Sequence, residues 1–114
     1  MPHFRIDCSE PVLSIATPEE IIDAVHDTAE DSELFRKGDI KVRIVPFSHY
    51  TSGGTKDDFI HITADIMGGR STEQKQLLSR SIVARLKPMF SSVQLVSIDI
   101  RDIDPETYTN LAKL

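Results

Sequence analysis

Pro2 is the residue whose type and position point most directly to chemistry, because loss of Met1 would give it a free secondary amine. Removal of Met1 is expected, since a small residue follows it. An α-amine has a reference pKa of about 8, and burial or cationic neighbours lower that pKa, so the amine would be a neutral base near pH 7. Many proteins carry proline here, so the alternative is an incidental Pro2. Pro2 stands at the start of a predicted core strand, and this position favours its interpretation as a catalytic base.

Three cationic side chains are candidates for binding an anion. Lys41 and Arg43 fall on the same face of a predicted strand, which in most proteins is simply a solvated face. Arg70 lies in the segment Gly68-Gly69-Arg70-Ser71, between a predicted strand and a predicted helix. That segment is either an ordinary turn or a place where backbone N–H groups, a helix N-terminus and a guanidinium meet a carboxylate. The sequence leaves both interpretations open.

The histidines and the single cysteine do not indicate a metal or thiol site. The histidines share no metal-ligand spacing, so each is interpreted as a strand-surface or loop residue, and no zinc signature is present. The cysteine is interpreted as a small buried residue at the end of a strand, and it has no second cysteine for a disulfide. We therefore expect no bound metal. The four histidines are His3, His26, His49 and His61, and the cysteine is Cys8.

Composition limits the class of partner. The 114 residues fit a single domain, 1–114, and a hydrophobic content of 39% is enough for a modest core. A net charge of −5 and a pI near 5.2 argue against nucleic-acid and anionic-membrane surfaces, which need clustered Lys and Arg. An anionic small molecule would need a local cationic pocket. The first residues lack the apolar stretch of a signal peptide and no run reaches transmembrane length, so a cytoplasmic location is expected.

Hydrophobic periodicity predicts four strands and two helices. Capping boxes at Thr17/Glu20 and Ser71/Gln74 mark the helix starts. Pro88 is expected to kink or end the second helix, and Pro46 to lie at the end or edge of its strand. The tail from 102 is expected to form short turns and a packed end. The predicted strands are 2–8, 40–47, 59–67 and 93–100, and the predicted helices are about 18–30 and from about 72 onward.

The two halves of the chain repeat the same order of elements, strand, helix and strand. Crossovers that contain a helix favour parallel strands and a right-handed connection, so the expected α+β fold has a four-stranded sheet with both helices on one face. The other face is too polar for a core, and it must be solvated or lie against polar surface in an oligomer. Its charged and polar residues are Arg5, Asp7, Arg43, His61 and Asp65.

Short motifs occur in a characteristic order along the chain. The opening Met1-Pro2-His3-Phe4 is followed by Asp7-Cys8-Ser9, then by Leu34-Phe35 with Ile40-Lys41-Val42-Arg43. Phe59-Ile60-His61-Ile62-Thr63 and Gly68-Gly69-Arg70-Ser71 complete the set. Together they resemble the 5-carboxymethyl-2-hydroxymuconate isomerases, a branch of the tautomerase superfamily. The resemblance extends to about residue 100, with a small gap at 52–56, and that family has the double β-α-β fold expected above.

The resemblance implies a homotrimeric isomerase that catalyses a 1,3-proton shift without a cofactor. Family substrates are dienols and unsaturated ketones with two or three carboxylates, formed in aromatic-compound breakdown. The resemblance places the base at Pro2, catalytic cations at Lys41 and Arg70, and substrate-binding residues at Arg43 and Phe35. Lys41 departs from the arginine of the compared family member and lacks its planar fork, which puts the substrate in question more than the chemistry. The alternative is a non-catalytic trimeric module, structural or binding a small ligand, on the same fold.

Overall fold

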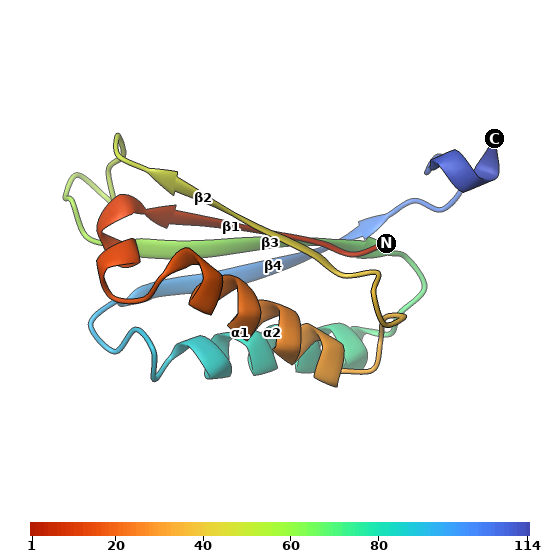
Figure 1. Cartoon of the computed structure of the whole chain (residues 1–114), viewed down its shortest axis with the longest axis horizontal. Coiled ribbons are helices and arrows are strands. Elements are labelled where there is room, and N and C mark those ends of the chain that lie inside the picture. The colour runs from red at the N-terminus through yellow and green to blue at the C-terminus, as the bar shows by residue number, and fades with distance from the viewer.

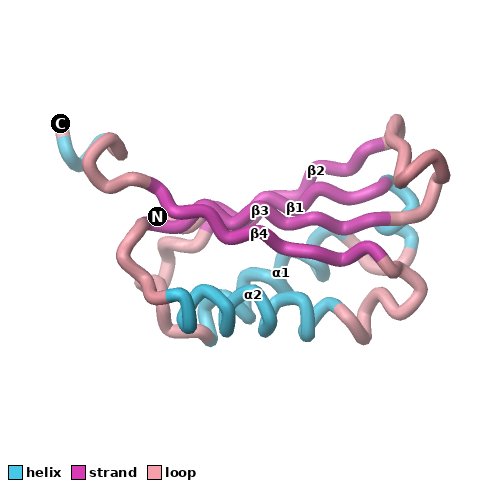
Figure 2. The backbone as a smooth tube through the Cα atoms, turned by 180° about the vertical axis from the view of Figure 1, so that it is seen from behind, coloured by secondary structure: helices cyan, strands magenta, loops and turns pink.

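Strand β1 is an interior strand of the sheet because it pairs with a neighbour on each side. In the computed structural model, which describes residues 1–114, four strands form one sheet in the order β2-β1-β3-β4. Two α-helices lie together beneath one face of that sheet (Figures 1 and 2). The elements are β1 (His3–Ser9), the short 3-10 helix η1 (Glu10–Ser14), α1 (Pro18–Asp31), β2 (Lys41–Phe47), β3 (Phe59–Met67), α2 (Thr72–Leu86), β4 (Leu95–Ile103) and η2 (Leu111–Lys113).

The sheet has the symmetry of a repeated β-α-β unit. β1 pairs with β2 in parallel, β3 pairs with β4 in parallel, and the two halves join through the antiparallel pair β1 and β3. The predicted tandem repeat, the four-stranded sheet and the two helices on one face are therefore confirmed. Pro46 lies in β2, which is an edge strand as expected.

Local sequence signals account for where the helices begin and end. Thr17 accepts a hydrogen bond from the backbone N–H of Glu20 at 3.2 Å, and the Glu20 carboxylate accepts one from the Thr17 N–H at 3.1 Å. Ser71 and Gln74 form the same reciprocal capping box at the start of α2. α2 ends at Leu86, just before Pro88, because proline has no N–H to continue the helical hydrogen bonds.

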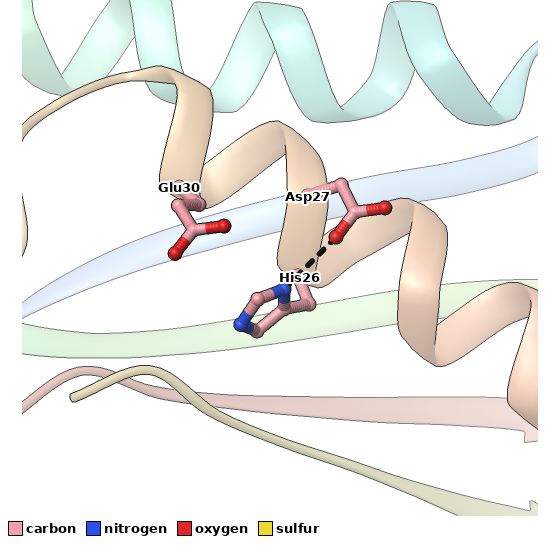
Figure 3. A group of neighbouring side chains, drawn as sticks. All are labelled: His26, Asp27 and Glu30. Atoms are coloured by element: carbon pink, nitrogen blue, oxygen red, sulfur yellow. Dashed lines mark hydrogen bonds and ion pairs between the residues drawn. The ribbon is translucent and has the colours of Figure 1, made fainter. Parts of the chain in front are cut away.

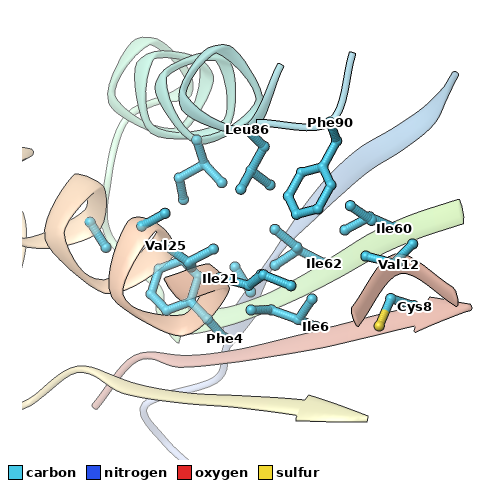
Figure 4. Packing of buried hydrophobic residues seen from close by; sticks show 14 of the residues in the cluster. Phe4, Ile6, Cys8, Val12, Ile21, Val25, Ile60, Ile62, Leu86 and Phe90 are labelled. Carbon is cyan, nitrogen blue, oxygen red and sulfur yellow. The ribbon is translucent and has the colours of Figure 1, made fainter. Parts of the chain in front are cut away.

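The core lies between the sheet and the helices. Alternate residues of β1 and β3 point toward α1 and α2 and are completely or almost completely buried (Figure 4). Burial of Cys8 raises the pKa of its thiol to about 11, so this cysteine is the small buried residue that the sequence indicated, with no tendency to ionise near neutral pH. The largest fully buried side chains include Phe4, Ile6, Ile21, Ile60, Ile62, Leu86 and Phe90.

The opposite face of the sheet is open and largely polar. Arg5 forms an ion pair with Asp7 at 3.3 Å, and the His61 ring shares a hydrogen bond with the Ser97 hydroxyl at 2.7 Å. Further charged residues occupy β4 on this face, where Arg101 pairs with Asp99 at 3.0 Å. No helix of the structure is both long and apolar enough to cross a membrane.

Two predictions for the C-terminal part are wrong. β4 begins at Leu95, two residues later than predicted, because Val93 packs into the core from the preceding loop. The strand also continues to Ile103, since β3 offers pairing partners as far as Met67. The tail is not packed. It leaves the end of β4 and projects from the body, with Leu111 and Leu114 almost fully exposed (Figure 1).

Candidate active site at the chain terminus

Pro2 is buried and held at the end of the sheet. Its carbonyl oxygen accepts a hydrogen bond from the Lys41 backbone N–H at 3.0 Å, so the pairing of β1 with β2 continues past His3 to this residue. Terminal residues usually fray unless such pairing secures them. The predicted base therefore has a defined position, although Met1 precedes it in this chain.

Lys41 lies beside the terminus and is in contact with it. Its Nζ donates to the backbone oxygen of Asp39 at 2.7 Å and contacts the Met1 Sδ at 3.5 Å. Loss of Met1 would remove the second of these partners. The ammonium would then keep two of its three N–H donors for another acceptor in the same place.

Arg70 connects two loops at this end of the molecule. Its Nη1 donates to the Met67 carbonyl at 3.0 Å and its Nη2 donates to the Leu34 carbonyl. The guanidinium also lies over the Phe35 ring, 5.1 Å from the ring centroid, and that ring meets Phe4 edge-on. The turn before α2 is thus tied to the segment after α1, and both terminal nitrogens of Arg70 have a protein partner.

Arg43 is linked to the site by a hydrogen bond to His3. Burial, with the charges of Arg43 and Lys41, lowers the pKa of His3, and the charge of Asp65 opposes that shift in part. The imidazole is therefore neutral at neutral pH. Because a guanidinium only donates, the His3 Nδ1 is the acceptor of the 3.2 Å hydrogen bond from Arg43 Nη1.

The terminal amine lies among several charges. Burial lowers the pKa of the Met1 α-amine below its usual 8.0, Asp39 raises it, and Lys41, Arg70 and Arg36 lower it further. This environment favours the neutral amine, which is the form that can accept a proton. Sequence reasoning did not identify Arg36 or Asp39. The run Arg36-Lys37-Gly38-Asp39, two cations before a glycine turn, is the signal that could have found them.

All five predicted site residues lie at the same end of the sheet, where backbone pairing, hydrogen bonds and ring contacts join them. The arrangement combines a buried Pro2 beside the chain terminus with several cations, so it can bind an anion next to a basic amine. On the single chain no enclosed pocket forms there. The largest surface hollow, about 550 Å³, lies at the opposite end of the sheet beside Phe90, Val93 and Val96. The five predicted site residues at the first end of the sheet are Pro2, Phe35, Lys41, Arg43 and Arg70.

A second group of polar side chains lies on α1. His26, Asp27 and Glu30 have ligand-type atoms within 4.8 Å of one another, and the His26 Nδ1 is 3.0 Å from the Asp27 carboxylate (Figure 3). His26 is thus on a helix, which corrects its interpretation as a strand or loop residue. Acidic groups beside a histidine often occur on surfaces without a metal, and no further feature of the structure points to an ion here.

A family model matches nearly the whole chain, and solved structures match its fold. A family model described as 5-carboxymethyl-2-hydroxymuconate isomerase matches residues 2–112. No curated protein sequence matches the chain. The solved 5-carboxymethyl-2-hydroxymuconate isomerase from Deinococcus radiodurans R1 is 20% identical, with a TM-score of 0.84 over 96% of this chain and 87% of that one.

Two further solved structures share the fold. A 5-carboxymethyl-2-hydroxymuconate delta-isomerase is 19% identical, with a TM-score of 0.77 over 96% of this chain and 87% of its own. The W0 fused 4-OT wild type symmetric trimer is 14% identical, with a TM-score of 0.80 over 98% of this chain and 95% of its own. At these identities the similarity establishes the fold.

The pKa of the Met1 α-amine should respond to Asp39 and Lys41 in opposite directions. Asp39→Asn removes a negative charge that favours the protonated amine, so the pKa should fall further below 8.0, whereas Lys41→Met should raise it. NMR titration of methionine-labelled chain measures both shifts. Asp57→Asn, in an exposed loop at the other end of the sheet, is the control and should change nothing. A pKa that is the same in all four proteins would contradict the electrostatic account.

Proposed function

Because this chain belongs to the 5-carboxymethyl-2-hydroxymuconate isomerase family, we propose that it moves a proton on an unsaturated keto or enol carboxylate, such as 5-carboxymethyl-2-hydroxymuconate, without a cofactor. The observation that carries the proposal is the position of Pro2, which is buried at the end of the sheet, next to a chain terminus whose amine is influenced by three cationic side chains. Such compounds arise in the breakdown of aromatic molecules. A cytoplasmic location is part of the proposal and suits a chain whose lone cysteine is a free thiol.

The proposed base is the Pro2 amine after removal of Met1. With a keto substrate the neutral amine takes a proton from a carbon next to the conjugated system, and the electron pair of the broken C–H bond moves to the keto oxygen. With an enol substrate it takes the hydroxyl proton, and the electron pair stays on that oxygen. Both steps form a dienolate. The protonated amine then returns the proton to a different carbon, and the carbonyl forms again. One group acts as base and then as acid, so the pKa of the amine must lie near the working pH.

Lys41 and Arg70 are proposed to stabilise the dienolate. Its negative charge develops in the transition state, and fixed positive groups close to the keto oxygen lower the barrier most when they need no rearrangement. The hydrogen bonds of Arg70 to Met67 and Leu34 hold its guanidinium in place before substrate arrives. Arg43 and the face of the Phe35 ring are proposed to bind the substrate beside them.

A homotrimer is the proposed assembly. The sheet face opposite the helices carries charged side chains that no part of the same chain covers. It also exposes apolar side chains near one end, among them Val45, Phe47 and Leu95. A symmetric trimer would cover such a face with copies of itself. The fused 4-OT structure that shares this fold is described as a trimer, which agrees with the proposal.

Activity should require a free amine on Pro2. Met1-free protein, verified by intact mass, should convert the enol of phenylpyruvate to its ketone, measured by ultraviolet absorbance. Pro2→Ala keeps an amine and should retain part of the activity, whereas acetylation of the terminus should lower it by about 10²-fold or more. Full activity of the acetylated protein would rule out the proline base. Absence of activity in the Met1-free protein would favour the non-catalytic trimeric module.

Arg70→Ala should lower kcat/KM by about 100-fold, the effect of losing one group that stabilises a developing oxyanion. The same change removes two hydrogen bonds to carbonyl groups, so the free energy of unfolding should fall by about 1.5–3 kcal/mol. Arg80→Ala, an exposed arginine of α2, is the matched control and should leave both quantities unchanged. Lys41→Arg should be tolerated, because it keeps the charge. Wild-type kinetics in Arg70→Ala would place the site elsewhere.

Light scattering at micromolar concentration should give three times the 12.8 kDa chain mass. Val45→Glu adds a charge to the exposed sheet face and should shift the population toward monomer. Leu77→Glu changes an exposed leucine on the helical side and should leave the mass unchanged. A wild-type protein that is entirely monomeric under these conditions would contradict the trimer.

A further inference from the structure

The connection between α1 and β2 carries a cation that the preceding mechanism does not use. Arg36 begins a tight turn in which its carbonyl oxygen accepts a hydrogen bond from the Asp39 N–H at 3.0 Å. Gly38, the third residue of the turn, has a φ of +90°, which suits glycine and is the requirement of a type II turn. The turn therefore has a defined shape, and it presents Arg36 and Lys37 at its start.

Contacts on both sides of the turn fasten it to the candidate site. Before it, the Leu34 carbonyl accepts a hydrogen bond from Arg70, and the Phe35 ring lies against the Arg70 guanidinium. After it, the Asp39 carbonyl accepts a hydrogen bond from the Lys41 ammonium. The backbone of Lys41 in turn pairs with Pro2. Arg36 is thus held next to the chain terminus by its neighbours in the sequence.

The side chain of Arg36 differs from the other cations of the site in having no partner. It is exposed and forms no hydrogen bond or ion pair, whereas both Nη groups of Arg70 donate to carbonyls and Arg43 donates to His3. Its charge adds to those of Lys41 and Arg70 in lowering the pKa of the terminal amine, which agrees with its place beside the site. The turn places Arg36 next to residues that contact Arg70, and its planar guanidinium has no partner in the chain.

We propose that Arg36 binds the carboxylate of the substrate that lies farthest from the reacting carbon, and so selects keto acids with a second carboxylate. The inference rests on the proposed function, whose site it completes. A guanidinium holds a carboxylate through two parallel hydrogen bonds, whereas the ammonium of Lys41 acts as a point charge. The guanidinium of Arg36 has no partner in the chain and adjoins the site, so recognition of a second carboxylate falls to the turn between α1 and β2.

The test compares two probes that differ in the number of carboxylates. NMR titration of the full-length, Met1-free chain with 2-oxoglutarate and with pyruvate gives a Kd for each, read from the backbone amide signals of Phe35 and Lys41. Arg36→Ala should weaken 2-oxoglutarate binding by about 10- to 100-fold, the usual effect of losing a charged hydrogen-bonding partner, and should change pyruvate binding by less than about 2-fold. Lys37→Ala is the matched control, because it removes a neighbouring exposed charge from the same turn.

Three other outcomes would decide against the proposal. Equal weakening in Arg36→Ala and Lys37→Ala would mean that only the general positive potential matters. Equal loss of both probes in Arg36→Ala would assign Arg36 to the carboxylate that all keto acids share. A wild-type chain that binds neither probe, or binds both equally, has no site for a second carboxylate. Binding needs no turnover, so a chain that binds 2-oxoglutarate through Arg36 but converts no enol would refute the proposed isomerase and leave this inference standing.

Discussion

The pairing of β1 on both sides is the interaction on which the candidate site depends. Chain ends are normally mobile, because few contacts offset the entropy of fixing them. Here the strand that begins at the terminus lies between β2 and β3, and its alternate side chains enter the core. The hydrogen bond from Lys41 to the Pro2 carbonyl extends that order to the start of the chain. In the proposed mechanism the terminal amine can act as a base because the sheet fixes its position.

The surroundings of the terminus are locally positive, although the whole chain is net negative. The chain has a formal charge of −5, yet the residues nearest the terminus are mostly cationic. Arg70 has two effects there, since its hydrogen bonds fix the segment after α1 while its charge favours the neutral amine. Asp39 acts in the opposite sense, and a pKa that stays within reach of neutrality requires both signs of charge. The charge around the terminal amine and the geometry of the neighbouring loops therefore depend on the same few side chains.

Much of the fold follows from local patterns. Alternating strands, two capping boxes and the helix-stopping Pro88 are all readable over a few residues, and the order of elements then leads to a double β-α-β unit. At the C-terminal end, local patterns did not predict the bounds of β4 or the exposure of the tail. Val93 has the hydrophobicity of a strand residue but packs from a loop, and the length of β4 depends on its partner β3. The leucines of the tail indicated packing, yet the single chain offers them no surface.

By itself, the sequence determined the strands, the helices, the family and the five residues expected at the site, because periodicity, capping and ordered motifs are properties of neighbouring residues. Only the tertiary structure decided how those residues meet. The hydrogen bond between Arg70 and the Leu34 carbonyl joins positions 36 residues apart, and Arg36 and Asp39, in the segment that follows Leu34, lie close enough to the terminus for their charges to act on its amine. Such contacts arise from the way the two halves of the sheet pack on their helices. The free energy that sets them comes from the whole core and not from any local segment.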